Sequence, residues 1–414
     1  MLSCTAMEYE LIHLPNGIRI VLHQVASPVS HACMLINAGS RDEREGTYGL
    51  AHFIEHLLFK QTERRNTHQI LNRLESVGGD LNAYTTKEYT CIHASFLTPY
   101  LDRTLDLFED LFFHSTFPEN ELEKEKGVIM DEMASYLDSP EDSIMDDFED
   151  QLFRGHELGH NILGTEADLA RLTRNDIAEF IHKNYQTHEI VVGITGNYTT
   201  RKVTGLAART LGKVPQTSGH QQRRAPQRPE IAQTRIEKPI NQTHYLMGGQ
   251  AYSVHHPNKV GLLLLNNLLG GMGMTSRLNL VVREKHGIAY TIESNYTPLS
   301  DTGIFHIYLG TDAEKTEKAL RLVNNELRKL REQKLGVMQL HQAKQKFKGQ
   351  IALAEENRLS LIISLVKNLM DEDRVQTLEE VFSRIDAVEA QQLLDIANEI
   401  LDERNLSSLS FVPE

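Results

Sequence analysis

Apolar and polar residues alternate along this chain with two different periods. Residues 47–59 and 120–138 carry apolar side chains every three or four positions, which is typical of amphipathic helices. The segments 17–23, 31–38 and 90–96 alternate or run apolar over shorter lengths, as strands do. Helices and strands mixed in this way predict an α+β fold in which sheets pack against helices.

The helix predicted over residues 47–59 places three chemically active residues on one face. Its buried face is an apolar stripe made of Leu50, Phe53, Ile54, Leu57 and Leu58. At about 100° per residue, His52, Glu55 and His56 fall on the opposite side, and Thr47 is a candidate N-cap. Two histidines at i and i+4 can bind one Zn²⁺, with Glu55 beside the ion. The alternative is that these three residues form an ordinary solvated face.

The helix predicted over residues 120–138 carries two carboxylates on its apolar side. Glu125 and Glu132 lie about two turns apart there, where an ionised carboxylate is costly unless a cation or several donors compensate it. One explanation is a metal ion held by His52, His56 and Glu132, with Glu125 orienting its neighbours. The other is that both glutamates pair with Arg or Lys residues from elsewhere in the chain.

A second segment, His156-Glu157-Leu158-Gly159-His160, has the H-E-x-x-H order of the common zincin helix. Gly155 and Gly164 flank it, and each glycine inside a helix costs about 1 kcal/mol relative to alanine. The metzincin continuation is also absent, because Leu163 and Glu166 stand where that pattern needs Gly and His. We therefore interpret this segment as a loop followed by a helix.

The order His52-x-x-Glu55-His56 is the inverted zinc motif H-x-x-E-H. Glu132 follows Glu125 by seven residues and His56 by 76. In these elements and their spacing the chain resembles the pitrilysin-type metallopeptidases, the inverzincin family that includes insulin-degrading enzyme and mitochondrial processing peptidase. The resemblance extends over nearly the whole chain. It implies that His52, His56 and Glu132 bind one Zn²⁺ per chain, that Glu55 is the general base and that Glu125 supports the site.

Residues 81–85 have the composition of a short strand near the predicted metal site. An exposed edge there could bind an extended peptide as an added strand, while an ordinary inner strand fits the residues equally well. In the family an Asn-Ala strand binds the substrate backbone. The resemblance therefore implies that Asn82 and Ala83 bind substrate.

A helix predicted from Ser276 ends at Gly287, and a strand follows it. Arg283 and Tyr290 lie seven residues apart across this junction. This R-x6-Y element is similar to the Arg and Tyr that reach the substrate in catalytically competent family members. The resemblance implies that Arg283 and Tyr290 bind substrate and stabilise the oxyanion of the reaction.

The chain contains an internal duplication. Residues 49–58 have a counterpart at 261–270 that keeps the apolar pattern without a metal ligand, and 83–85 are matched by 289–291. This repeat predicts two similar tandem domains, each a mainly antiparallel sheet packed with helices. We place an N-terminal zinc-binding catalytic domain at residues 1–215, a polar linker at 216–235 and a C-terminal substrate-binding domain at 236–414.

Composition narrows the class of protein. The 414 residues are 40% hydrophobic, which allows two sizeable cores, and the net charge of −14 argues against a nucleic-acid-binding surface. Three cysteines without C-x-x-C spacing indicate neither a disulfide framework nor a cysteine zinc site. Residues 1–8 lack the basic and apolar segments of a secretory leader, and no run is apolar enough for a membrane span. We therefore expect a cytoplasmic protein that does not contact membranes.

The function predicted is that of a zinc metalloendopeptidase that hydrolyses extended peptides or unfolded polypeptide segments within an enclosed chamber. Two alternatives stay open: a non-catalytic peptide-binding or interaction subunit of a related heterodimer, and a peptide-binding module without turnover. Family chains near this length act as dimers, which implies a homodimer that combines the zinc domain of one subunit with the Arg283–Tyr290 domain of the other. A heterodimer with a related chain is the alternative assembly. The chain departs from the family at Gln61, where Gly is expected, and at Val281-Val282, where Glu-Leu is commoner.

Overall fold

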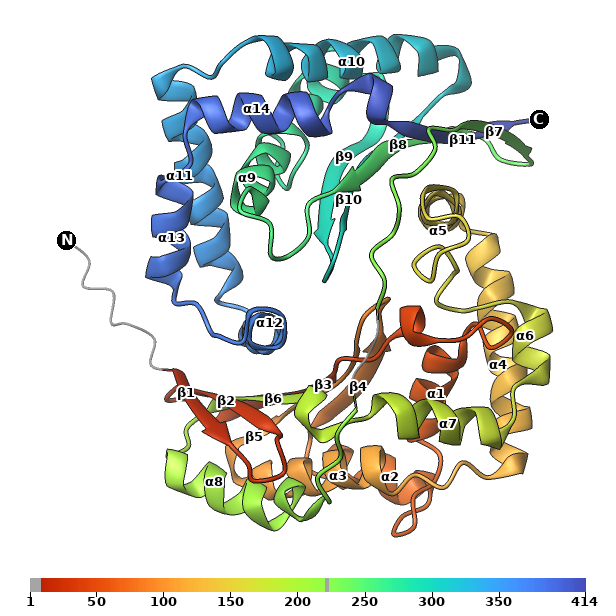
Figure 1. Ribbon diagram of the computed structural model, residues 1–414, viewed down its shortest axis with the longest axis vertical. Helices are drawn as coiled ribbons and strands as arrows, with labels where there is room; N and C mark the ends of the chain where they lie inside the picture. Colours follow the sequence, from red (N-terminus) through yellow and green to blue (C-terminus); the bar gives the residue numbers. More distant parts are fainter. Residues whose placement is uncertain (1–8, 220–222) are drawn as a thin grey trace. The chain divides into compact units, whose positions relative to one another are not determined.

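The computed structural model describes residues 9–219 and 223–414, which form two compact units. Each unit is one β-sheet packed with helices, so the predicted α+β class with two tandem domains is confirmed (Figure 1). Residues 1–8, with Cys4 and the expectation about a leader, lie outside the described residues, as do residues 220–222 of the predicted linker. In the part of the chain that is described, no helix is both long enough and apolar enough to span a bilayer.

Unit 1 comprises the described residues of Met1–Met133, His160–Arg223 and Leu353–Leu378. Its strands are β1 (Tyr9–His13), β2 (Arg19–Gln24), β3 (Val29–Ile36), β4 (Asp80–Thr85), β5 (Thr90–Leu97) and β6 (Ile190–Gly196). Its helices are α1 (Leu50–Leu58), α2 (Thr67–Glu75), α3 (Leu101–Phe113), α4 (Glu119–Leu137, whose last turn is assigned to unit 2), α6 (Glu166–Arg171), α7 (Arg174–Asn184), α8 (Thr200–Arg209) and α12 (Arg358–Glu372).

Unit 2 comprises Ala134–Gly159, Arg224–Ala352 and Glu379–Glu414. Its strands are β7 (Gln233–Lys238), β8 (Thr243–Ala251), β9 (Ala289–Pro298), β10 (Gly303–Thr311) and β11 (Ser407–Pro413). Its helices are α5 (Pro140–Leu152), α9 (Lys259–Leu269), α10 (Thr316–Glu332), α11 (Val337–Ala354), α13 (Leu378–Asp386) and α14 (Ala390–Ile400), and the π-helix η5 spans Asn279–Glu284.

Five strands of each sheet share one topology, which agrees with the internal duplication, and β1 is an additional strand in unit 1. The strand order is β1-β2-β6-β3-β5-β4 in unit 1 and β7-β11-β8-β10-β9 in unit 2. In each sheet one pair is parallel, β2 with β6 and β7 with β11, and every other pair is antiparallel. The strand β4 corresponds to β9, and both lie at the edge of their sheet. The prediction of two mainly antiparallel sheets is therefore confirmed.

The units are not continuous in sequence, and this corrects the predicted division at 216–235. Helix α5 comes from the first half of the chain but packs against β8 and β11 of unit 2, while α12 comes from the second half and packs against β2, β3 and β6 of unit 1. The physical reason is burial, because each helix covers an apolar sheet face with its own apolar stripe. In addition, β7 already begins inside the stretch predicted to be a linker.

The sheet of unit 1 is covered on both faces. Cys33 and Leu35 of β3 pack against Ile362 of α12. Because side chains alternate along a strand, Ala32 and Met34 point to the opposite face, where α3 contacts β3 and β5. All four strand residues are fully buried. The result is a sheet held between helices on either side.

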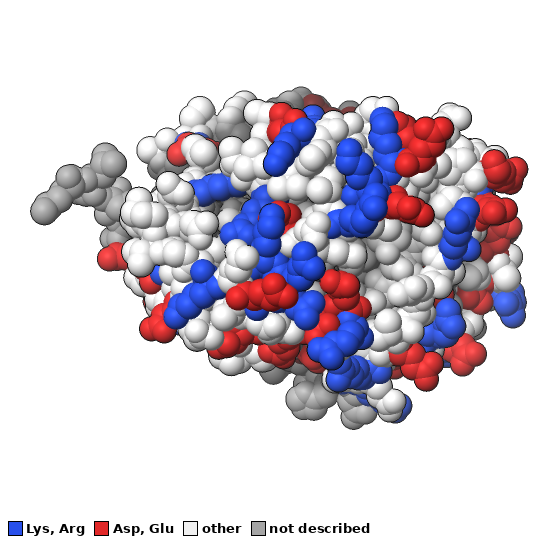
Figure 2. All heavy atoms as spheres, turned by 90° about the horizontal axis from the view of Figure 1, so that it is seen from above, with Lys and Arg blue, Asp and Glu red and all other residues white. Residues whose placement is uncertain are grey.

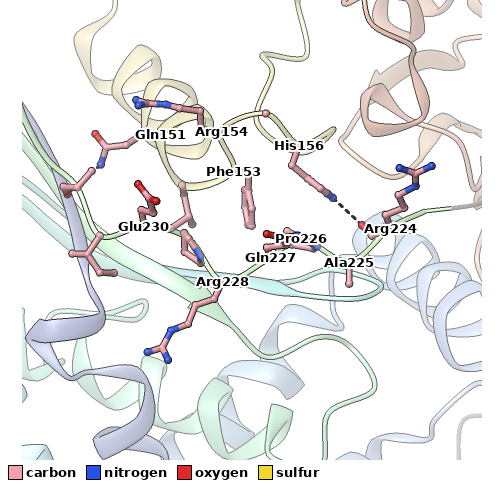
Figure 3. A pocket seen from close by; sticks show the side chains of 15 residues that line it. Gln151, Phe153, Arg154, His156, Arg224, Ala225, Pro226, Gln227, Arg228 and Glu230 are labelled. Carbon is pink, nitrogen blue, oxygen red and sulfur yellow. Dashed lines mark hydrogen bonds between the residues drawn. The ribbon is translucent and has the colours of Figure 1, made fainter.

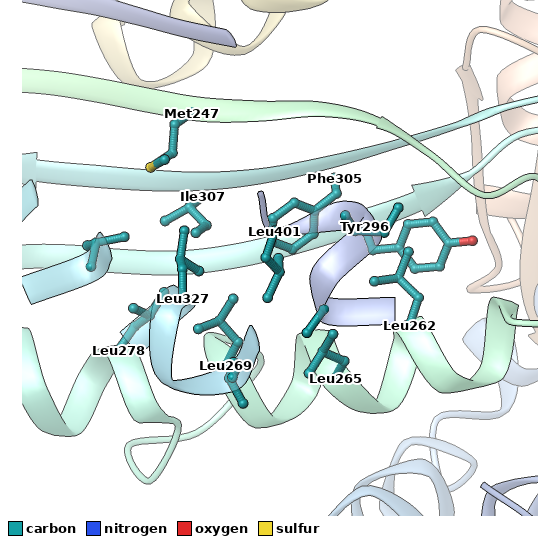
Figure 4. Packing of buried hydrophobic residues seen from close by; sticks show 14 of the residues in the cluster. Met247, Leu262, Leu265, Leu269, Leu278, Tyr296, Phe305, Ile307, Leu327 and Leu401 are labelled. Carbon is teal, nitrogen blue, oxygen red and sulfur yellow. The ribbon is translucent and has the colours of Figure 1, made fainter. Parts of the chain in front are cut away.

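The larger core of unit 2 lies between its sheet and helices α9, α10 and α14 (Figure 4). The figure labels Met247, Phe305 and Ile307 on the sheet above Leu265 and Leu269 of α9. Helix α10 buries its apolar stripe in this core, and most of its charged residues are exposed, although Glu326 is buried and pairs with Lys329. On the face seen from above in Figure 2, Lys and Arg side chains are interspersed with Asp and Glu, so the acidic excess of the chain does not gather there.

The contact between α12 and the sheet of unit 1 depends on one glycine. A Cβ atom added to Gly193 of β6 would lie 2.6 Å from Ile362 Cγ1 and Val366 Cγ2, and 2.9 Å from Cys33 Sγ. These distances are much shorter than normal van der Waals contacts. The glycine therefore lets the helix approach the sheet closely.

We expect Gly193→Ala to lower the free energy of unfolding by about 1–3 kcal/mol, since an added methyl group forces α12 away from the sheet. Gly205→Ala in α8 is the control, because a Cβ there meets nothing within 4 Å. That substitution should stabilise the protein by about 0.4–1 kcal/mol. Urea unfolding of both variants measures the difference. Equal stabilities would contradict the close packing of α12.

Candidate metal centre

The helix that carries the inverted zinc motif is α1, and it is buried on nearly all sides. His52 and Glu55 are each 8% exposed, and only His56 among its nine residues is partly exposed. The predicted cap Thr47 is wrong, because the N-cap is Gly49, with φ of 92°, and glycine has no side chain to accept a hydrogen bond. The carboxylate of Glu43 takes that role. It accepts from Gly49 N at 2.9 Å and from Ala51 N at 2.7 Å.

The structure brings His52, His56 and Glu132 together. Nε2 of His52 lies 3.8 Å from one carboxylate oxygen of Glu132, and Nε2 of His56 lies 3.5 Å from the other. One donor atom from each residue can be chosen so that all three lie within 4.8 Å of one another. A tetrahedral zinc site with bonds of about 2.0–2.1 Å separates its donors by roughly 3.3 Å, so these spacings suit one ion. The Glu132 side chain is 44% exposed, which differs from its expected place on a buried face.

The hydrogen bond of His56 to Glu125 uses Nδ1 and leaves Nε2 facing Glu132. Its Nδ1–H donates to Glu125 Oε2 at 3.2 Å, so the lone pair is on Nε2. The other oxygen of Glu125 lies 2.6 Å from Lys60 Nζ. Glu125 is 5% exposed and thus has both a cationic and a histidine partner. The sequence left two explanations for Glu125: pairing with an arginine or lysine, or orienting the neighbours of a metal site. Both apply, since Glu125 pairs with Lys60 and also orients the candidate ligand His56.

His52 is neutral at neutral pH. Burial, with a smaller contribution from His56, lowers the pKa of His52 to about 4. Its Nδ1 is buried and has no partner among the described residues, whereas its Nε2 faces Glu132. Two neutral imidazole nitrogens and one carboxylate oxygen are a donor set that suits Zn²⁺ and leaves a fourth position open. The residues present therefore fit a zinc ion.

Glu55 is held by the neighbouring strand. Thr85, the last residue of β4, donates its hydroxyl to Glu55 Oε2 at 2.6 Å. Burial raises the pKa of the Glu55 carboxyl, whereas the Thr85 hydroxyl and His56 act in the opposite direction and Glu132 adds to the increase. A carboxylate with a raised pKa beside a candidate metal site is suited to accept and return a proton.

The strand that positions Glu55 also carries Asn82 and Ala83. This strand, β4, pairs with β5, so that Asn82 lies opposite His93 and Ala83 opposite Ile92. It is the last strand at one edge of the sheet. Of the two readings left open by the sequence, the structure favours an edge strand. Such an edge presents backbone N–H and C=O groups that an extended peptide can pair with.

Arg283 and Tyr290 belong to unit 2, whereas the residues of the candidate metal centre belong to unit 1. Arg283 lies in the π-helix η5, and Tyr290 is the second residue of the edge strand β9. Both side chains are exposed, Tyr290 by 59%. The helix predicted from Ser276 is thus partly a π-helix, a form that occurs often at functional sites.

The H-E-x-x-H segment forms no helix, as predicted, and its two histidines have separate partners. Nε2 of His156 donates to the carbonyl of Arg224 at 2.8 Å, inside a pocket of about 620 Å³ in unit 2 (Figure 3). Nε2 of His160, in unit 1, lies 3.0 Å from Glu43 Oε2 and 2.9 Å from the carbonyl of Ser40. The segment is a series of turns between α5 and α6.

Comparison with known proteins agrees with the fold and with the motif. The family model for insulinase, peptidase family M16, matches residues 19–166, and the model for the peptidase M16 inactive domain matches residues 171–347. A Bacillus subtilis protein named uncharacterized zinc protease YmxG is 32% identical over 396 residues, 94% of each chain.

Two solved structures share the fold at a TM-score of 0.90. One is described as a peptidase M16 inactive domain from Pseudomonas fluorescens, with 20% identity over 99% of this chain and 98% of that one. The other is a protease from Helicobacter pylori, with 22% identity over 99% of this chain and all of that one. The fold and the inverted motif define an inverzincin-type protein. The chain belongs to peptidase family M16.

Three residues that contact the site were not predicted from the sequence. They are Glu43, Lys60 and Thr85, which bind the N-terminus of α1, Glu125 and Glu55 respectively. Each is a common residue type that reaches its partner through the folded chain. One local signal was available, since Lys60 follows His56 by four residues.

We expect Glu125→Gln to weaken zinc binding by about 10–100-fold, because His56 loses the carboxylate that orients its ring. Lys60→Met should act in the same direction, since it leaves the buried Glu125 without its cation. Lys124→Met is the control, because this lysine lies beside Glu125 on α4 but is exposed and pairs with Glu121. Competition with a chromogenic chelator, without substrate, measures the affinity. Unchanged affinity in Glu125→Gln would refute the role of Glu125.

Proposed function

We propose that this protein is a zinc metalloendopeptidase that cleaves extended peptides or unfolded segments. The observation that carries the proposal is the convergence of His52, His56 and Glu132 beside Glu55. Membership of peptidase family M16 supports it, as does the relative named a zinc protease. The proposed zinc content is one ion per chain.

The residues of the metal centre divide the chemistry among them. His52, His56 and Glu132 would hold the ion, and Glu125 with Lys60 would fix the ring of His56. When bound, zinc lowers the pKa of a water molecule toward about 7 and polarises the scissile carbonyl. Glu55 accepts the proton of the attacking water and passes it to the departing amine.

Substrate binding is proposed at the free edge of β4. A peptide lying there as an added strand would pair with the backbone of Asn82 and Ala83 and place few demands on side chains. The same strand ends in Thr85, whose hydroxyl holds Glu55. A peptide on this edge is therefore aligned by the element that also positions the base.

Arg283 and Tyr290 are proposed to complete the site from a second subunit. An arginine or a phenol directed at the developing oxyanion is a donor whose loss costs about 10²–10³ in turnover. In a homodimer, unit 2 of one chain would serve unit 1 of its partner, and the substrate would be enclosed between them. A heterodimer with a related chain would use the same arrangement.

A non-catalytic interaction subunit is the second candidate. The family model over residues 171–347 is described as an inactive domain, and it covers much of the half that has no metal ligands. Against this, unit 1 retains the three proposed zinc ligands and the proposed base, Glu55. Loss of cleavage on removal of the base separates the two candidates.

We expect Glu55→Gln to lower cleavage of an unstructured peptide mixture by about 10²–10⁴-fold, because the base is lost. Zinc per chain should stay at the wild-type value, since Glu55 is not a proposed ligand. Glu157→Gln, in the turn-forming H-E-x-x-H segment, is the control and should cleave normally. Mass spectrometry of the digests and metal analysis provide both readings. Cleavage that survives Glu55→Gln would reject the assigned base.

Mixing two inactive chains tests the shared site. Glu55→Gln lacks the base, while Tyr290→Phe lacks the phenol that we propose to serve the partner. Random mixing makes half of all dimers mixed, each with one complete site, so roughly a quarter of wild-type activity should return. Each variant mixed with itself is the control. If mixed dimers form and no activity returns, each chain uses its own Tyr290.

A further inference from the structure

The N-terminus of α1 is held by Glu43, a residue that precedes the helix by only a few positions. Glu43 binds the two backbone N–H groups that begin this helix, at Gly49 and Ala51, and its side chain is fully buried. Ala51 directly precedes the candidate ligand His52. A carboxylate at this position satisfies two N–H groups that lack partners within the helix and interacts favourably with the helix dipole.

His160 holds that carboxylate in turn. Its Nε2–H is shared between Glu43 Oε2, at 3.0 Å, and the carbonyl of Ser40, at 2.9 Å. Its ring stacks on Tyr48, with centroids 4.1 Å apart and planes at 15°, and its own carbonyl accepts from Lys87 Nζ at 2.5 Å. The imidazole is thus fixed from several directions.

The loop that carries His160 packs closely against the start of α1. A Cβ added to Gly49 would lie 2.4 Å from the carbonyl oxygen of Leu163, and one added to Gly164 would lie 2.1 Å from that of Tyr48. Both glycines have positive φ, 92° and 76°. The backbone of this loop therefore meets the backbone before α1 without room for side chains, so the two segments must move together.

Burial raises the pKa of the Glu43 carboxyl, while His160 and the N–H groups of Ala51 and Gly49 act in the opposite direction. These donors compensate the cost of placing a carboxylate in the interior. Burying the Glu43–His160 pair costs free energy, whereas a serine, threonine, aspartate or asparagine at the N-cap would satisfy the same N–H groups at lower cost. A buried pair with this cost at the start of α1 indicates that the position of the helix has to be fixed.

We infer that Glu43 and His160 are a positioning pair that sets the axial position of α1, and through it the places of His52, Glu55 and His56. This inference rests on the proposed function, because the geometry that it protects is that of the zinc centre. The second histidine of the H-E-x-x-H segment thus supports the metal helix through Glu43 and does not itself bind the metal. Neither residue touches the substrate.

The test compares full-length Glu43→Gln and His160→Ala with His156→Ala. We expect the first two to weaken zinc binding about tenfold and to lower kcat of the zinc-saturated enzyme about tenfold with KM unchanged, because the ligands and base shift while the β4 edge does not. Hydrogen exchange in a peptide covering residues 47–58 should quicken by a similar factor. His156→Ala is the matched control from the same segment and should equal wild type in all three measurements.

His160→Gln should restore most of the lost affinity and kcat, since its amide N–H can donate to Glu43 where the imidazole did. The double variant of Glu43→Gln and His160→Ala should be little worse than Glu43→Gln alone, because both residues act through one contact. If Glu43→Gln does not fold, His160→Ala alone decides, as it leaves the cap of α1 in place. Wild-type zinc affinity and kcat in His160→Ala would overturn the inference.

Failure of the proposed function gives a different result. Wild-type protein that binds no zinc, or Glu55→Gln that still cleaves, would reject the peptidase centre. The rate of hydrogen exchange in residues 47–58 would then still report whether Glu43 and His160 hold α1.

Discussion

The structure of unit 1 depends on placing two imidazoles and a carboxylate on one nine-residue helix, where His52 and Glu55 are buried and His56 is partly exposed. Polar groups in the interior are costly unless they have partners, and α1 obtains partners both from the segments that flank it and from distant elements. Thr85 binds Glu55, Glu125 with Lys60 binds His56, and Glu43 binds the first N–H groups. Elements far apart in sequence must therefore meet at α1 before its side chains can take up one arrangement.

The sheets supply the rigid support for these contacts. In each unit a helix from the other half of the chain covers one sheet face, α12 in unit 1 and α5 in unit 2. This exchange ties each sheet to remote sequence, so neither half of the chain completes its own unit. Gly193 shows how closely the exchanged helix approaches, since a Cβ at this position of β6 would lie 2.6 Å from side-chain carbons of Ile362 and Val366 in α12. The edge strand β4 is hydrogen-bonded to β5 of this sheet, and its last residue, Thr85, holds Glu55.

Local periodicity predicted α1, α4 and the strands around them close to their observed bounds, because apolar spacing is a property of neighbouring residues. It also singled out two glutamates, although only Glu125 is buried while Glu132 is exposed. The exchange of α5 and α12 was not predicted, since an apolar stripe indicates burial without naming the sheet that it covers. Glu43 and His160 were missed for a similar reason, because their contact spans 117 residues.

The second unit shows that the fold itself does not require the polar residues of α1. Aligning the duplicated segments places Leu264, Asn267 and Leu268 of α9 where α1 has His52, Glu55 and His56. Leu264 is fully buried, and Asn267, at the position of Glu55, is buried but uncharged and donates to Gln350. The same architecture thus forms without imidazoles or a carboxylate at these positions. Since such groups are expensive to bury and the fold can do without them, stability does not explain their presence in α1, whereas the proposed metal centre does.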